Sequence, residues 1–242
     1  MRFYSEGGID KLIRLVFFPL RAYKGVFVEV GAADPSYLSI SKHFRDSGWN
    51  VISIEPNPYF AKRHREVGNK ILEYACGEKD ENNIEFEIVR PKIPGTIGQT
   101  TYESFSAIKV KEAYKQMDPS FHSKMDAEKI SVNMRRLDTL LRENGITFID
   151  ILAVDVEGWE LEVLSGLNFD LYTPKLLVVE NWLRDGKYVK KIVSYGYSFV
   201  CRVLLNDIYV KTDTFSNIKI NIARVYSRII NIVHRITQIF VQ

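Results

Sequence analysis

The chain has 242 residues, of which 46% are hydrophobic, 12% aromatic and 26% charged, which suits one soluble globular domain with a full core. Two cysteines, Cys76 and Cys201, are too few for a disulfide framework or a metal-ligating cluster, so a reducing compartment is expected. The net charge of +3 is unevenly spread: residues 1–25 carry +3 and residues 214–242 carry +4, which leaves −4 for residues 26–213. This acidic body argues against nucleic acid as a partner.

From residue 26 onward, predicted strands alternate with predicted helices. The first three strands are expected at 26–30, 50–55 and 70–75. A helix that begins at Pro35 and stops near Gly48 follows the first strand, and a basic helix over 59–68 follows the second. Alternation of this kind predicts an α/β fold with a parallel, doubly wound sheet.

The second half of the chain continues the pattern after an interruption. A strand is expected at 81–89, and residues 91–130, rich in Pro, Gly and polar side chains, are expected to form an excursion over the cleft. The remaining elements are a strand from 130, a helix over 136–145, a nearly continuous apolar strand at 148–155, a helix over 158–166, a strand at 175–181, and an antiparallel pair at 197–203 and 206–211.

Both ends of the chain mix apolar residues with Lys and Arg. We expect an N-terminal amphipathic helix region over 1–25, a main domain over 26–213 and a basic amphipathic helix over 214–242. Such helices suit peripheral contact with an anionic membrane, and packing on the domain itself or in a homodimer is the other interpretation. Neither a transmembrane segment nor a cleaved secretory signal is indicated, so we expect a cytoplasmic protein, with the inner face of the membrane as its peripheral site.

Small or acidic residues follow four of the predicted strands. Gly31, Glu55, Asp155 with Glu157, and Glu180 all fall at carboxyl ends, where parallel sheets place their ligands. Glu55 lies 24 residues after Gly31, about the spacing at which an acid accepts hydrogen bonds from ribose. With Glu29 added, the predicted cleft is strongly negative, which favours a cationic nucleoside over a pyrophosphate.

The segments "VFVEVGAADPSYLS", "GWNVISIEPNP", "ACGEKDENNIEFEIV" and "IDILAVDVEGWELEVLSGL" resemble, in order and spacing, the FkbM-type family of S-adenosylmethionine-dependent methyltransferases. The resemblance covers roughly residues 5 to 211, and "DVEGWELEVLSG" is its most specific part. It implies a class I methyltransferase fold, which is Rossmann-like: a seven-stranded, mostly parallel sheet whose last strand is antiparallel. It also implies O-methylation as the commonest activity.

The same resemblance assigns roles to residues. It implies that S-adenosyl-L-methionine contacts Glu29, Gly31, Ala32, Ala33 and Asp34 around its methionine part, Glu55, Pro56 and Asn57 at the ribose, Ala75, Cys76 and Gly77 near the adenine, and Asp155 at the sulfonium. Glu157 would start the next helix near that site, and Glu180 would border the acceptor pocket. Ala33 stands where the family often has Asn, which removes one side-chain hydrogen bond to the cofactor, and Pro35 replaces a frequent Gly.

Methyl transfer to a hydroxyl requires alignment and removal of a proton. Asp155 is the first candidate for the proton acceptor, with Glu157 and Glu180 as alternates, and positioning of the cofactor is the other role open to Asp155. His43 and His122 are less favoured candidates. No spacing of ligands specifies a metal, so metal independence is predicted. Tyr102, Ser104, Phe105 and Ser106 in the excursion suit a sugar or glycan acceptor.

Two other classes of function fit parts of the sequence. A nicotinamide-dependent oxidoreductase would explain Gly31 and Glu55, but the Gly-x-Gly-x-x-Gly fingerprint is missing from the sequence and Asp155 and Glu157 would have no role. A non-catalytic nucleoside-binding or membrane-associated scaffold would tolerate Ala33, whereas the intact segment 155–166 argues for activity.

Overall fold

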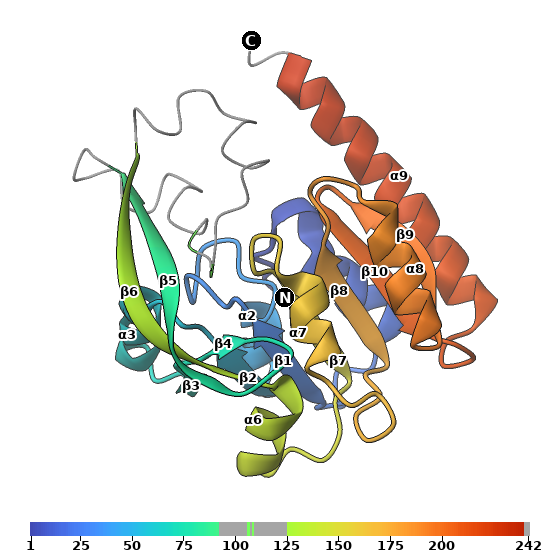
Figure 1. The fold of residues 1–242 in the computed structure, drawn as a ribbon. Coiled ribbons are helices and arrows are strands. Elements are labelled where there is room, and N and C mark those ends of the chain that lie inside the picture. Colours follow the sequence, from blue (N-terminus) through green and yellow to red (C-terminus); the bar gives the residue numbers. More distant parts are fainter. Residues whose placement is uncertain (92–105, 107, 109–124, 240–242) are drawn as a thin grey trace.

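The computed structural model describes residues 1–91, 106, 108 and 125–239 of the chain (Figure 1). Its centre is a seven-stranded sheet in the order β3-β2-β1-β7-β8-β10-β9. The first five strands of that order are parallel, and β10 runs antiparallel to both of its neighbours. The strands are β1 (Val26–Val30), β2 (Asn50–Ile54), β3 (Ile71–Leu72), β7 (Ile151–Val154), β8 (Leu176–Glu180), β9 (Tyr197–Val203) and β10 (Asn206–Lys211). The prediction of a mostly parallel sheet that ends antiparallel is confirmed.

The two faces of this sheet bury two separate apolar clusters, because alternate residues of each strand point to opposite sides. In β1, Val28 and Val30 join the cluster beneath α6 (Leu137–Glu143), α7 (Glu160–Ser165) and α8 (Gly186–Ser194). Phe27 faces the other cluster, which is covered by η1 (Glu6–Gly8), α1 (Ile9–Leu12), η2 (Ile13–Phe17), α2 (Lys42–Asp46) and the long helix α9 (Asn217–Ile239). Helices therefore cover both faces, as the nearly continuous apolar strands predict.

A second, three-stranded sheet stands beside the first. It consists of β4 (Ala75–Cys76), β6 (Met125–Arg135) and β5 (Glu81–Pro91) in the order β4-β6-β5. In Figure 1 the long β5–β6 ribbon curves away from the main sheet, on the side of α3 (Pro58–Glu66). Among the described helices, none combines the length and the apolar content needed to cross a membrane.

Several predicted elements differ from the structure. The helix expected from Pro35 to Gly48 is only α2, five residues long, because Leu38 adopts a left-handed φ of 54° that an α-helix does not allow. The strand expected at 70–75 is divided between the two sheets as β3 and β4. The excursion expected to reach residue 130 ends earlier, because β6 begins at Met125 and pairs with β5. Helix α8 was not predicted, although Asp185 caps it by accepting a hydrogen bond from the Lys187 amide.

Candidate functional site

A cavity of about 360 Å³ opens at the carboxyl ends of β1, β2, β7 and β8. The predicted strand-end residues Gly31, Glu55, Asp155, Glu157 and Glu180 all line it, and Glu29 does so as well. Of the other residues predicted to hold a cofactor, Ala32, Ala33, Asp34, Pro56, Ala75 and Cys76 are also in its wall. The site is therefore a single pocket to which four strands contribute, with a volume in the range of small-molecule sites.

Gly31 makes the close approach of two strand ends possible. Its φ is +81°, and a Cβ added at this position would overlap the carbonyl oxygen of Asp155. The amides of Gly31 and Ala32 both donate to the carbonyl oxygen of Ile54, at 3.0 and 3.2 Å. The loop after β1 is thus held against the ends of β2 and β7, and only glycine satisfies both the dihedral angle and the space.

Glu55 fixes the loop that follows. One carboxylate oxygen accepts from the Ala33 amide at 2.9 Å and the other accepts from the Asn57 amide at 2.8 Å. Burial raises the pKa of Glu55 to about 7, although these two hydrogen bonds oppose the shift. Each oxygen keeps a second lone pair, so the carboxylate can still accept from a ligand hydroxyl in the cavity. Asn57 itself backs Glu55 and caps α3 by accepting from the Tyr59 amide.

Asp34 and Glu29 have mainly local partners. Asp34 accepts from the amides of Ser36 and Tyr37, both at 2.7 Å, and forms an ion pair with Arg63. Glu29 accepts from the Ser41 hydroxyl at 2.6 Å. Burial raises the pKa of Glu29, whereas the Ser41 hydrogen bond and the nearby Arg45 lower it. Both acids shape the loop between residues 31 and 41 and still present oxygen atoms to the cavity wall.

His64, which the sequence did not indicate as a site residue, supports the loop between residues 31 and 41 from α3. It is fully buried, and its Nε2 lies 3.1 Å from the carbonyl oxygen of Ala33. Its Nδ1 lies 3.2 Å from the side-chain amide nitrogen of Asn69, which can only donate a hydrogen bond. Nδ1 is therefore the acceptor, and Nε2 carries the proton and donates to the Ala33 carbonyl oxygen. Burial lowers the pKa of His64, which keeps it neutral. The sequence signal was the position of His64 on the inner face of the helix that follows Glu55.

Of the two histidines that the sequence suggested as candidates, His43 does not line the cavity. His43 is buried in α2, where its Nδ1 lies 2.7 Å from the carbonyl oxygen of Arg2 and its ring packs on Phe3. It therefore anchors the first residues of the chain. His122 falls outside the described residues, as do Tyr102, Ser104 and Phe105 of the excursion, whereas Ser106 does line the cavity and contacts Asn57.

Asp155, Glu157 and Glu180 form a compact cluster of carboxylates, with one oxygen from each lying within 4.8 Å of the others. One oxygen each of Glu157 and Glu180 is buried and has no hydrogen-bond partner among the described residues. Burial raises the pKa of Asp155 to about 7 and raises the pKa values of Glu157 and Glu180 well above the usual range of a glutamate, and repulsion from neighbouring carboxylates adds to each shift.

None of the salt bridges in the described part of the chain involves this carboxylate cluster, and two kinds of ligand could supply a positive partner. A divalent cation prefers oxygen ligands of this type. A sulfonium group is the other candidate, and it would neutralise the carboxylates without requiring a fixed coordination geometry. Within the described cavity wall Arg63 is the only cationic side chain, beside seven acidic ones, and it is already paired with Asp34. The cavity therefore favours a cationic ligand and repels a pyrophosphate.

Glu160 holds the turn that carries Asp155 and Glu157. One of its carboxylate oxygens accepts from the amides of Val156 and Gly158, at 3.2 and 2.8 Å, and the other accepts from the Tyr188 hydroxyl at 2.5 Å. Glu157 adopts a left-handed φ of 57°, which the turn imposes. The sequence included Glu160 in its most specific motif without giving it a role, and its partner Tyr188 lies on the unpredicted helix α8.

The far end of the cavity is apolar. Phe60, Tyr74, Phe86 and Ile108 line it together with Ala75 and Cys76. Gly77 does not lie in the cavity wall and instead packs against the side chain of Met134. The opposite end, next to Glu180, is lined by Trp159, Trp182 and Asn206. The cavity wall is thus apolar beside β4 and β5, and it carries aromatic and polar side chains beside β8 and β10, a side that we call the mouth.

Comparison with known proteins shows that this chain is similar to methyltransferases. The model of the family described as Methyltransferase FkbM domain matches residues 29–199, which include the residues described above from Glu29 to Tyr188. A curated relative, named Methyltransferase sdnD, from Sordaria araneosa, is 41% identical over 69 residues. That match covers 25% of this chain and 27% of the relative, so the chain spans about a quarter of the length of the curated relative it matches.

Proposed function

Because the chain belongs to the FkbM methyltransferase family, we propose that it is an S-adenosylmethionine-dependent methyltransferase of the class I fold that methylates a hydroxyl of a sugar or glycan acceptor. The observation that carries the proposal is the acid-lined cavity, with unpartnered oxygens of Glu157 and Glu180 beside Asp155. A positively charged sulfonium nucleoside is complementary to this charge, and a nicotinamide dinucleotide with its pyrophosphate is not.

The proposed cofactor contacts follow the geometry of the cavity. Glu29, Gly31, Ala32, Ala33 and Asp34 line the part assigned to the methionine group, Glu55 and Pro56 the part assigned to the ribose, and Ala75 and Cys76 the apolar part assigned to the adenine. Asn57 acts through Glu55, whose orientation it fixes. Gly77 contributes to packing behind this pocket and not to cofactor contact. When bound, the cofactor supplies an electrophilic methyl group.

The protein's own task in the reaction is to hold the acceptor hydroxyl and remove its proton. Asp155 is the proposed acceptor of that proton, because its pKa of about 7 matches a general base that works near neutral pH. Glu180 lies close to Asp155 in the carboxylate cluster, and the turn fixed by Glu160 holds both Asp155 and Glu157 in place. The positive charge of a bound sulfonium would favour the ionised form of Asp155 further.

The acceptor class is proposed from the mouth of the cavity. Trp159 and Trp182 offer flat apolar faces, while Asn206 has a buried side-chain oxygen without a hydrogen-bond partner among the described residues. Aromatic rings combined with a few polar groups suit the apolar faces and hydroxyls of a sugar. Metal independence stays part of the proposal: we expect turnover to persist in EDTA, and full loss that Mg²⁺ restores would instead place a divalent ion among Asp155, Glu157 and Glu180.

The first test is calorimetric titration with S-adenosylhomocysteine, run beside NAD. We expect selective binding of the adenosyl ligand and at least tenfold weaker binding in Glu55→Ala, because the ribose loses its acceptor. Binding of NAD instead would support an oxidoreductase, and binding of neither by folded protein would support a scaffold. If cofactor binding is found, single-turnover methylation at saturating cofactor should fall at least a hundredfold in Asp155→Asn, and an unchanged rate would exclude Asp155 as the base.

A further inference from the structure

Helix α9 packs Ile220, Ala223 and Ile230 against the protein but directs most of its Ile and Val side chains away from it. Seven Ile and Val residues at helical spacing are between 48% and 73% exposed: Ile218, Ile222, Val225, Ile229, Ile232, Val233 and Ile236. On a helical wheel of about 3.6 residues per turn they share one face, whose centre lies opposite the packed residues Ala223 and Ser227. We call these seven residues the outer stripe. A helix that served only to cover the sheet would place such residues inward.

The inner side of α9 is firmly attached, so the outer stripe is presented by a fixed helix. Ala223 and Ser227 are buried, and Asn231 bonds the backbone at both Arg202 and Leu204, at 2.8 and 2.9 Å. Nearer its start, the Lys219 amino group donates to the carbonyl oxygen of Phe17 at 3.0 Å. Figure 1 shows the helix lying along the outside of the sheet, next to β9.

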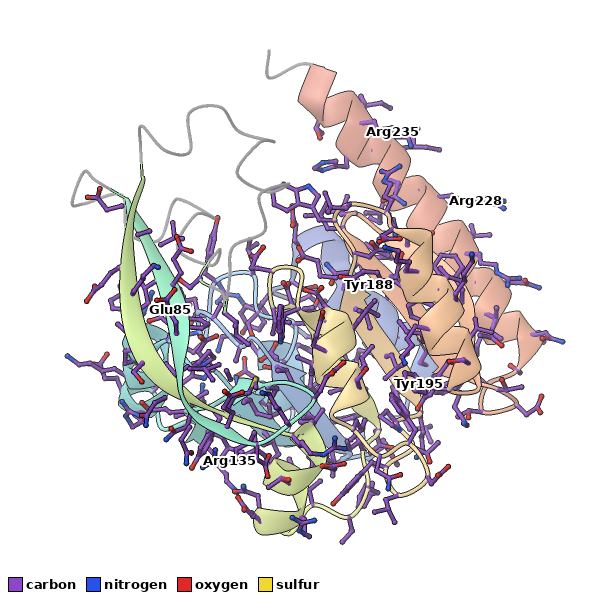
Figure 2. The ribbon with its side chains drawn as sticks, viewed as in Figure 1. Glu85, Arg135, Tyr188, Tyr195, Arg228 and Arg235 are labelled. Carbon is purple, nitrogen blue, oxygen red and sulfur yellow. The ribbon has the colours of Figure 1, made fainter. Side chains whose placement is uncertain are left out.

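Positive charge borders the outer stripe. Arg224, Arg228 and Arg235 fall within about 40° of one another on the helical wheel, at one edge of the stripe. The helix from Asn217 to Ile239 contains no Asp or Glu. Figure 2 shows Arg228 and Arg235 on the outer side of α9, and neither forms a salt bridge within the described part of the chain.

The N-terminal segment, which was expected to form a membrane-facing helix as well, is mostly buried. Ile9, Leu12, Ile13, Phe17 and Phe18 pack against the sheet and belong to the core. Leu15 and Leu20 are exposed, but the longer run of exposed apolar residues beside basic ones lies on α9.

We propose that the outer stripe of α9 inserts into the interfacial region of an anionic lipid bilayer, with Arg224, Arg228 and Arg235 at the level of the lipid phosphates. Apolar residues on one face and arginines at its edge are the features that hold a helix in the plane of a membrane surface. A second copy of the chain fits less well as the partner of the outer stripe. Each α9 helix carries four basic residues and no acid, so two helices packed through their stripes would repel each other.

The test is co-sedimentation of the full chain with vesicles of phosphatidylcholine alone or with phosphatidylglycerol added. We expect binding to the anionic vesicles that weakens as salt is raised, and little binding to the neutral ones. Ile222→Ser with Ile229→Ser, and separately Arg228→Glu with Arg235→Glu, should each weaken binding at least tenfold. All four positions are exposed or on the outer side of the helix, so the variants should fold.

Matched controls change the same chemistry elsewhere on the surface. Val67→Ser with Val193→Ser removes two apolar side chains that are 59% and 48% exposed, and Lys187→Glu with Lys190→Glu reverses two charges on α8. Both should bind vesicles like the wild type. Absence of wild-type binding to anionic vesicles, or equal loss in variants and controls, would overturn the proposal. A dimer in sedimentation velocity that only the Ile222→Ser, Ile229→Ser variant dissociates would also overturn it, in favour of a second copy. None of these residues lines the cavity, so the result does not depend on methyl transfer.

Discussion

At the scale of single residues, the site holds buried carboxyl groups that repel one another, and a ligand of opposite charge would relieve that repulsion. Glu180 is buried, one of its oxygens has no partner within the described structure, and it is surrounded by Asp155, Glu157 and Glu160. Buried groups of this kind destabilise the protein without a ligand. Such arrangements are typical of functional sites, where stability is lost in exchange for binding or catalysis.

We predict that Glu180→Gln stabilises the protein without cofactor and lowers its activity. At pH 8 the free energy of unfolding should rise by roughly 1–3 kcal/mol, since a buried, repelled carboxylate is replaced by a neutral amide of similar shape. Methyl transfer should fall at least tenfold because the carboxylate cluster loses one of the acidic groups that attract the sulfonium. Thermal unfolding with parallel rate measurements checks both effects.

Glu162→Gln is the matched control for this prediction. Glu162 is on α7 and also has a buried oxygen without a described partner, but it lies outside the cavity. The control should neither lose activity nor gain stability to the same degree. If Glu180→Gln destabilises the protein while Glu162→Gln does not, the carboxylate cluster is not under repulsive strain.

At the scale of elements, the site depends on how tightly loop and strand ends meet. Gly31→Ala should prevent cofactor binding and destabilise the protein severely, because the new methyl group would overlap the Asp155 carbonyl oxygen. Gly68→Ala is a close control: Gly68 has a similar φ of +75° but open space around it. That variant should lose only about 1–2 kcal/mol, the cost of a left-handed alanine. Equal melting temperatures for the two variants would show that the contact with Asp155 is unimportant.

The contact between α8 and the turn after β7 gives a second prediction at this scale. Tyr188→Phe removes the hydroxyl that donates to Glu160, so the turn carrying Asp155 and Glu157 should loosen. We expect kcat to fall about tenfold, with the affinity for S-adenosylhomocysteine nearly unchanged and a stability loss of about 1 kcal/mol, typical of one hydrogen bond. Steady-state kinetics and calorimetry separate these effects.

Tyr195→Phe serves as the control for Tyr188→Phe. Figure 2 shows the two tyrosines at opposite ends of α8, and Tyr195 stacks on Phe169 without a hydroxyl hydrogen bond to Glu160. It should leave kcat unchanged. A loss of kcat in both variants would point to a general disturbance of α8.

The main sheet and the ends of its strands could be predicted from the sequence. Buried parallel strands appear as apolar runs, and a Gly or an acid directly after such a run lies at the edge of the sheet where ligands bind. Gly31, Glu55, Asp155 and Glu180 were located in this way. The second sheet could not, because residues 125–129 are largely polar and form a strand only through their pairing with β5. Glu160 and His64 were also missed, since each acts by bonding a backbone or side-chain group whose position only the folded chain defines.

At the scale of the whole molecule, the buried acids link stability to pH. Burial raises the pKa of Glu55 from 4.5 and of Asp155 from 3.8, each to about 7, and those of Glu29, Glu157, Glu160 and Glu180 also rise. The folded protein therefore holds more protons than the unfolded chain between about pH 4 and 7. Stability from these groups is fully present at low pH and is lost as the pH rises through about 7.

This linkage predicts how the charge of a ligand affects its binding. S-adenosylmethionine and S-adenosylhomocysteine differ by one methyl group and one positive charge, and only the cation stabilises ionised carboxylates in the cavity. We expect the rise in melting temperature caused by S-adenosylmethionine, relative to that caused by S-adenosylhomocysteine, to increase from pH 6 to pH 8. Calorimetry in buffers of different ionisation enthalpy should show proton release when the cation binds at pH 7. If the two ligands stabilise the protein equally at every pH, the carboxylate cluster of Asp155, Glu157 and Glu180 does not face the sulfonium, and the proton acceptor must be sought elsewhere in the cavity.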